Sequence, residues 1–150
     1  MEGAFWGPDG LRGRLPPGLR SMSGRETPEG RRWDLLALTE AACRAPGSWR
    51  AVCGTVLLPG DRGAQTLRRV RAERVVDYGL SPRDTLTLSG VEGGWVVCVQ
   101  RTLLRPDGGL VEEQELVLPP LALPPEDLLA LAGTWLLAGP PGGPPRETFL

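Results

Sequence analysis

The sequence predicts an α+β fold in which a curved antiparallel sheet of about five strands forms a meander. Three observations lead to this prediction: a strong hairpin pattern at residues 95–118, short apolar runs separated by turns from residue 49 onward, and helical patterns at both ends. Consecutive strands joined by short turns pair as antiparallel neighbours. We therefore expect an N-terminal cover helix and a C-terminal helix packed on the sheet.

The hairpin is the clearest structural signal in the chain. Two apolar-rich runs flank the segment Arg105-Pro106-Asp107-Gly108-Gly109. Pro106 presets φ for a turn, Asp107 can hydrogen-bond to its own backbone, and both glycines accept a positive φ. The pattern predicts a β-hairpin whose turn lies in this segment.

Two amphipathic patterns predict helices. The first is expected over residues 28–45, where Thr27 can cap the helix and Pro28 suits its first position. The second is expected over residues 126–138, with acidic residues in its first turn and Gly139 after its end.

The remaining strands are less clearly marked. Residues 49–58 read as a strand that is broken or bulged at Gly54. Residues 65–78 favour a strand, although a helix is an alternative for residues 65–74. Residues 85–91 alternate apolar and polar side chains, which predicts a short strand.

The chain is expected to hold one domain at residues 28–139. Residues 1–27 are rich in Gly, Pro and Arg without a period, so we expect a flexible arm. Two alternatives are a translation start at Met22 and an arm whose aromatic residues 5–6 anchor it to the domain or to a partner. Residues 140–150 are expected to form a flexible Pro/Gly-rich tail.

The composition limits the chemistry. All 17 cationic residues are arginine, and the sequence contains no Lys, Asn, Ile or His. The first three missing types have AT-rich codons, which indicates a GC-rich genome. The absence of histidine excludes His-based acid–base catalysis, Ser-His-Asp triads and imidazole metal sites. We expect no cofactor, and the formal net charge of −1 gives no general attraction to nucleic acid or anionic membranes.

The cysteines and the apolar runs indicate a cytoplasmic protein. Cys43, Cys53 and Cys98 lie far apart and form no CxxC motif, so we interpret them as reduced, mostly buried thiols. No signal-peptide pattern is visible at the N-terminus. No apolar run approaches the length that a membrane span requires.

Two oppositely charged segments are candidates for partner binding. Arginines on one predicted strand can contact an acidic partner, pair with glutamates elsewhere in the sheet or remain solvated, whereas nucleic acid is unlikely because aromatic residues are not interleaved. The glutamates also suit a charged outer face that prevents aggregation. The candidate residues are Arg68, Arg69, Arg71, Arg74, Glu112, Glu113 and Glu115.

Aromatic residues suggest a different site. Tryptophans in core positions are the simplest interpretation, but a pocket between helix and sheet can use them to bind an apolar or planar ligand. The residues expected in such a pocket are Trp49, Trp95, Trp135 and Tyr78. Gly47-Ser48-Trp49 before a strand loosely resembles the start of lipocalin-type barrels, over three residues only. That resemblance implies an apolar-ligand carrier.

A third candidate is the set Asp77, Tyr78 and Asp84. A tyrosine beside carboxylates can perform acid–base chemistry, although a tyrosine at a strand end is more often a packed edge residue. An enzyme of this kind requires a cleft that gathers Asp77, Asp84 and a glutamate.

The function expected from the sequence is therefore a non-catalytic binding or adaptor protein. It would act through a sheet surface or edge on another protein or on a second copy, as a homodimer. The alternatives are a carrier of an apolar or planar molecule in a tryptophan-lined pocket, and a histidine-free enzyme that uses carboxylates and Tyr78.

Overall fold

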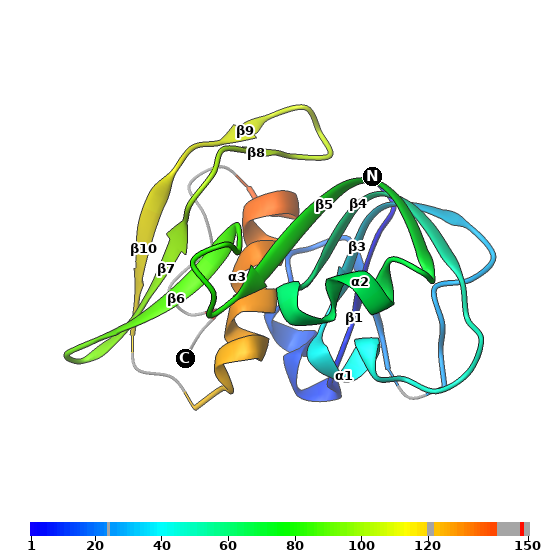
Figure 1. The fold of residues 1–150 in the computed structure, drawn as a ribbon, viewed down its shortest axis with the longest axis horizontal. Helices are drawn as coiled ribbons and strands as arrows, with labels where there is room; N and C mark the ends of the chain where they lie inside the picture. Colours follow the sequence, from blue (N-terminus) through cyan, green and yellow to red (C-terminus); the bar gives the residue numbers. More distant parts are fainter. Residues whose placement is uncertain (24, 120–121, 141–147, 149–150) are drawn as a thin grey trace.

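The computed structural model describes residues 1–23, 25–119, 122–140 and 148. In this part of the chain a mixed sheet surrounds one long helix (Figure 1). The strands are β1 (Gly3–Trp6), β2 (Leu19–Met22), β3 (Arg32–Leu38), β4 (Ala51–Pro59), β5 (Val70–Gly79), β6 (Leu86–Val91), β7 (Gly94–Val99), β8 (Leu103–Leu104), β9 (Leu110–Val111) and β10 (Gln114–Leu118). The helices are η1 (Asp9–Arg14), α1 (Glu40–Cys43), η2 (Gly60–Arg62), α2 (Gly63–Thr66) and α3 (Pro125–Ala138).

The main sheet has eight strands in the order β10-β7-β6-β5-β4-β3-β1-β2. All neighbours from β2 to β6 are parallel, and only β6-β7 and β7-β10 are antiparallel. The predicted antiparallel meander of five strands is therefore wrong. Strands of a parallel sheet are covered on both faces and carry continuous apolar runs, so their pairing leaves little alternation in the sequence.

Strand β3 replaces most of the helix predicted over residues 28–45, so that prediction is wrong. Its sequence, RWDLLAL, is rich in Leu and Ala, which favour helices in isolation. Burial between β1 and β4 overrides this preference, because each side chain from Leu35 to Leu38 is fully enclosed. Only Glu40–Cys43 is helical, with the Ala42 amide donating to Thr39 Oγ1 (3.3 Å).

The first 22 residues contribute two strands, where the sequence predicted a flexible arm. Strand β1 lies between β2 and β3. Phe5 and Trp6 are both buried and point into the two core clusters on opposite sides of the sheet. The structure thus matches the alternative in which residues 5–6 anchor this segment to the domain. Of the predicted tail at residues 140–150, only Pro140 and Thr148 lie within the described residues.

The other predicted strands are present with shifted ends. Residues 49–58 correspond to β4 and residues 85–91 to β6. Residues 65–78 begin in the short helix α2 and continue as β5, so both readings of this segment are partly right.

The predicted irregularity at Gly54 is also present. Cys53 belongs to the same core cluster as Val56, although simple alternation would place these residues on opposite faces. In the neighbouring strand the Glu2 carbonyl accepts hydrogen bonds from the consecutive amides of residues 34–35, at 2.7 and 3.4 Å. The pairing of β4 with β3 and β5 skips Gly54 but keeps the same register on both sides of it, so the strand is broken there without an inserted residue.

The sheet consists of two halves that meet over two residue pairs. Strands β5 and β6 pair only at Tyr78–Leu86 and Gly79–Thr87. The parallel strands β2-β1-β3-β4-β5 form one half and the antiparallel strands β6-β7-β10 the other. Helix α3 lies between the halves (Figure 1) and contacts β3, β4, β5 and β6. No helix among the described residues is long and apolar enough to cross a membrane.

Helix α3 confirms the helix predicted over residues 126–138, but it is enclosed rather than laid across one face. Every residue from Leu128 to Leu137 is buried. Gly133 marks the closest approach to both halves, because a Cβ atom there would lie 2.9 Å from Leu57 on β4 and 2.9 Å from Leu86 on β6.

Replacing Gly133 with Leu is expected to destabilise the protein by about 2–3 kcal/mol, because the larger side chain overpacks the junction of the two halves. Urea unfolding monitored by circular dichroism measures this change. Ala138→Leu, at a partly exposed position near the end of the same helix, is the control. An equal or smaller loss for Gly133→Leu would contradict the packing described here.

The predicted hairpin is confirmed. Strand β7 pairs with β10 from Val99–Gln114 to Trp95–Leu118, and β8 pairs with β9 nearer the turn. In the turn Gly108 has φ +91°, and the Arg105 amide donates to the Gly109 carbonyl (2.8 Å). Because β7 and β10 belong to the main sheet, the hairpin tip extends from the antiparallel half over the end of α3 (Figure 1).

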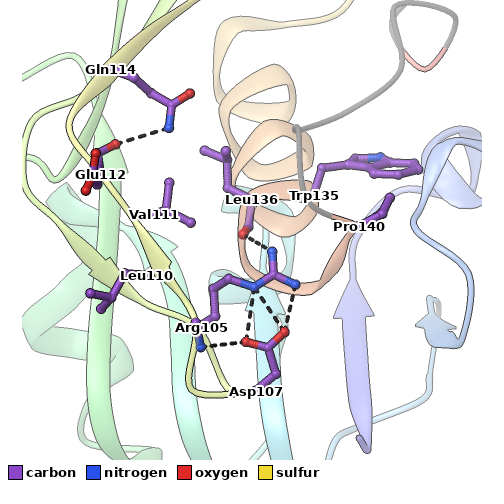
Figure 2. A pocket seen from close by; sticks show the side chains of 10 residues that line it. Arg105, Asp107, Leu110, Val111, Glu112, Gln114, Trp135, Leu136 and Pro140 are labelled. Atoms are coloured by element: carbon purple, nitrogen blue, oxygen red, sulfur yellow. Dashed lines mark hydrogen bonds and ion pairs between the residues drawn. The ribbon is translucent and has the colours of Figure 1, made fainter.

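Arg105 joins the hairpin tip to α3. Its Nη1 donates to the Leu136 carbonyl (2.7 Å) and its Nη2 to the Gly139 carbonyl (2.6 Å), as Figure 2 shows in part. Asp107 pairs with the same guanidinium (3.1 Å), and this hydrogen bond lowers the pKa of the Asp107 carboxyl. The last carbonyls of a helix have no partner within it, so Arg105 satisfies groups that would otherwise be left unpaired.

Arg105→Ala is expected to cost about 2–4 kcal/mol of unfolding free energy, because two charge-assisted hydrogen bonds are lost at a largely buried position. Chemical denaturation of the variant and of Arg105→Lys, which retains the charge but not the planar fork, provides the measurement. A loss no larger than that of Arg12→Ala, at an exposed site on η1, would show that the contact has no stabilising role.

Candidate functional site

A cleft of about 550 Å³ opens where β4 and β5 end. It lies at the carboxyl ends of neighbouring parallel strands, where α/β sheets commonly bind ligands. Its polar lining residues, which define the acidic cleft, are Asp61, Asp77, Ser81, Arg83, Asp84 and Glu126. They come from η2, the end of β5, the following loop and the first turn of α3.

Two glycines allow the carboxylate of Asp84 to lie in the wall of the acidic cleft. Gly60 follows β4 and Gly79 ends β5. A Cβ atom on either glycine would collide with the Asp84 carboxylate. The absence of side chains at these two positions therefore creates the space that Asp84 occupies.

Asp84 is the most enclosed carboxylate of the cleft, with 6% of its surface exposed. Its Oδ2 accepts a hydrogen bond from the Ser81 amide (3.1 Å). Burial raises the pKa of Asp84 against the opposing effect of that hydrogen bond, and the nearby charges of Asp77 and Asp61 raise the pKa further. Ionised Asp84 therefore lowers the free energy of unfolding.

Asp77 shapes the loop that follows β5. Its Oδ1 accepts hydrogen bonds from both the amide and the hydroxyl of Thr85, at 2.8 and 2.7 Å. Arg101 lies 4.0 Å from the same oxygen. One oxygen of Asp77 thus fixes the end of the loop in place.

Two side chains from the connection after β7 hold the same loop. The amide group of Gln100 donates to the carbonyls of Pro82 (3.1 Å) and Asp84 (2.7 Å). Arg101 donates to the Arg83 carbonyl (2.6 Å) and to the Thr85 hydroxyl (3.0 Å). The wall of the acidic cleft is therefore preorganised by the protein itself.

The hydroxyl of Tyr78 is not available in the cleft. Tyr78 is 1% exposed, and its hydroxyl donates to the Leu38 carbonyl at the end of β3 (2.8 Å). Burial raises the pKa of Tyr78 well above its ordinary value. The structure thus gathers Asp77, Asp84 and a glutamate as the third sequence hypothesis required, but its tyrosine hydroxyl serves the packing of β5 on β3.

Sequence reasoning did not associate Asp61 or Glu126 with this site. Both are exposed at the rim of the cleft. Glu126 suits the first turn of a helix, and Asp61 suits a turn, so each has a sufficient local explanation. Their position immediately after β4 and at the start of α3 becomes informative only when the strand order is known.

The carboxylates line the walls of the cleft rather than converge on a point. Among the described residues, no three Asp, Glu or Cys side chains lie close enough together to hold a metal ion. The spacing suits a ligand larger than a single ion.

The four aromatic residues expected in one pocket lie in different parts of the fold. Trp49 packs edge-on against Trp6 (ring centroids 4.9 Å apart) in the core cluster opposite α3. Trp135 lies on α3 and donates to the Arg14 carbonyl (2.8 Å). Trp95, on β7, is half-buried against the core on the α3 side. The sheet separates Trp49 from Trp95 and Trp135.

The oppositely charged segments are also separated. The arginines lie at the amino end of β5, whereas the glutamates lie on or beside the edge strand β10. Strands β6 and β7 stand between them in the sheet. The observed ion pairs of the described residues do not join Arg68, Arg69, Arg71 or Arg74 to any glutamate of residues 112–115.

A second hollow of about 520 Å³ lies between the hairpin tip and the end of α3 (Figure 2). Most of its polar side chains already have partners within the protein. Arg105 binds Asp107 and the helix carbonyls, and Gln114 donates to the Glu112 carbonyl (3.1 Å). These groups serve the structure, so the hollow offers less to a ligand than the acidic cleft does.

The three cysteines are free. Burial raises the pKa of Cys53 to about 12 and also raises the pKa of Cys43. Neither thiol is therefore activated as a nucleophile.

No protein-family model, no curated protein and no solved structure matches this chain. The arguments for function therefore come from the geometry of the chain itself.

Asp84→Asn is expected to raise the melting temperature at pH 7. The raised pKa means that ionised Asp84 opposes folding above its folded-state pKa. This opposition shrinks as the pH falls through that value and is absent below the unfolded value of about 4. The gain in Tm should therefore diminish toward pH 4, as measured by calorimetry across this range.

The amide oxygen of asparagine can still accept the hydrogen bond from Ser81. Asp9→Asn, on the exposed η1, is the matched control and should leave Tm unchanged at each pH. A lower Tm for Asp84→Asn at pH 7 would mean that the charge of Asp84 stabilises the fold.

Proposed function

We propose that the protein is a non-catalytic binding protein whose acidic cleft holds a small cationic molecule that bears amino or guanidino groups. The observation that carries this proposal is the gathering of four carboxylates and one guanidinium around a single cleft. The carboxylates belong to Asp61, Asp77, Asp84 and Glu126, and the guanidinium to Arg83.

The charge balance of the cleft supports a cation. Four carboxylates face Arg83 and the neighbouring Arg101, which lies 4.0 Å from Asp77, so an excess of negative charge remains in a partly enclosed space. At an effective dielectric constant of about 20, two unit charges 4 Å apart interact by about 4 kcal/mol, compared with about 1 kcal/mol in water. A bound ammonium or guanidinium group would relieve the cost of keeping Asp84 ionised.

The shape of the site supports an extended ligand. Carboxylates from η2, β5, the following loop and α3 line the cleft and suit a molecule with more than one hydrogen-bond donor. Apolar groups of Pro59, Leu80 and Leu129 also line the cleft and can pack against the methylene chain of such a ligand.

Binding is favoured over catalysis for chemical reasons. The chain has no histidine, and the Tyr78 hydroxyl is occupied by the Leu38 carbonyl. The carboxylates of the cleft therefore have neither a histidine nor a free tyrosine hydroxyl as a partner in acid–base catalysis. The homodimer predicted from the charged strands remains a prediction.

Isothermal titration calorimetry with spermidine and agmatine tests the proposal, with glutarate as the anionic comparison. We expect saturable binding of the cations, weakened by added salt, and no binding of glutarate. The double variant Asp61→Asn/Glu126→Gln should weaken binding at least about tenfold, which corresponds to about 1.4 kcal/mol.

Both substituted side chains are exposed, and neither forms an ion pair within the described part of the chain, so the fold should tolerate the change. Glu113→Gln/Glu115→Gln, beside and on β10, removes the same charge outside the lining of the cleft and should bind as the original protein does. Equal weakening by both double variants, or no saturable binding of either cation, would overturn the proposal.

A further inference from the structure

The opposite end of the parallel strands carries a surface of different chemistry. Pairing aligns Arg32 on β3 with Val52 on β4, and Val52 with Arg71 on β5. Residues aligned across neighbouring strands project from the same face of a sheet. The amino ends of β3, β4 and β5 therefore present a valine with an arginine on each side. These three residues, with Arg50 immediately before β4, form the basic row.

Val52 is unusually exposed for its position. Strand β4 lies in the interior of the sheet order, yet 45% of Val52 is accessible. Helix α3 packs on β4 further along the strand, at Leu57, where Gly133 approaches it. The amino end of the strand is thus an apolar point on an uncovered part of the sheet.

A hollow of about 540 Å³ adjoins Val52 and is lined by Glu29, Arg31, Arg32 and Arg50. Three of these residues already form hydrogen bonds or ion pairs within the protein. Glu29 accepts the Arg50 amide (2.7 Å), Arg31 pairs with Glu2 (3.2 Å), and Arg32 bridges Asp34 (3.4 Å) and Glu73 (3.1 Å).

Two guanidinium groups beside Val52 are uncommitted. Arg50 and Arg71 are exposed, and neither takes part in an ion pair formed by the described residues. Guanidinium groups bind carboxylates through two parallel hydrogen bonds. Free arginines around an exposed valine complement a segment in which acidic residues flank an apolar one.

We propose that the basic row is a docking surface for an acidic peptide segment of another protein, which places an apolar side chain on Val52 and carboxylates on Arg50 and Arg71. Nucleic acid fits this surface less well. Trp33, the aromatic residue beneath Arg31, is buried and cannot stack on a base. This surface is separate from the acidic cleft, because the two lie at opposite ends of the parallel strands.

Fluorescence anisotropy with a labelled peptide of alternating Glu and Val tests the proposal. The comparison ligands are the same peptide with Gln in place of Glu, and a single-stranded oligonucleotide. We expect saturable binding of the acidic peptide, weakened by salt, and at least about tenfold weaker binding of both others. Tighter binding of the oligonucleotide than of the acidic peptide would overturn the proposal.

Variants locate the contact. Arg71→Glu should weaken peptide binding at least about tenfold, and Val52→Thr, which keeps the size but adds a hydroxyl, about threefold to fivefold. Arg12→Glu makes the same charge change on η1 and should alter binding less than twofold.

Circular dichroism establishes that each variant is folded, and Arg50→Gln/Arg71→Gln replaces Arg71→Glu if the charge reversal prevents folding. Equal losses for Arg71→Glu and Arg12→Glu would show general charge attraction and overturn the proposal. Unchanged binding by the Val52→Thr variant would show that the peptide makes no apolar contact with Val52 and would overturn that part of the proposal.

Discussion

The fold depends on the complete enclosure of helix α3. Each residue from Leu128 to Leu137 is buried, so the helix requires apolar partners on all sides rather than on one face. A single flat sheet cannot supply them. The two half-sheets, joined only where Tyr78 and Gly79 pair with β6, diverge around the helix and enclose it. At the end of α3, Arg105 donates hydrogen bonds to the Leu136 and Gly139 carbonyls. Apolar side chains cannot supply such bonds, and the last carbonyls of a helix have no partner within it.

The same arrangement gives the two ends of the parallel strands different sets of side chains. In a parallel sheet the amino ends of all strands lie at one end of the sheet, and their carboxyl ends lie at the other. Arginines such as Arg50 and Arg71 lie at or next to the starts of strands, and carboxylates such as Asp77 and Asp84 lie at or after their ends. Charges that nearly cancel in the sequence are therefore distributed unevenly: carboxylates predominate around the acidic cleft, whereas arginines and acidic residues are mixed at the amino ends of the strands. The near-neutral net charge describes neither end of the sheet.

Local patterns predicted the elements whose stability is local. The hairpin and α3 were recognised because turn residues and helix ends have specific backbone requirements. Strand β3 was mistaken for a helix because the chain lacks isoleucine and builds this interior strand largely from Leu and Ala. Strand β1 was missed because a strand of four residues that begins with glycine carries no measurable period. Asp77 and Asp84 were recognised as a pair, since only six residues lie between them, but Asp61 and Glu126 were not.

The sequence alone determined the turn at Arg105–Gly109, the extent of α3 and the absence of histidine chemistry, because these follow from residue identity and nearest neighbours. Tertiary structure decided the parallel strand order and therefore which distant side chains meet. Glu126 joins Asp77 in one cleft, and Val52 lies between Arg32 and Arg71, only because of that order. The order reflects how the whole chain buries α3, and no local segment encodes that requirement.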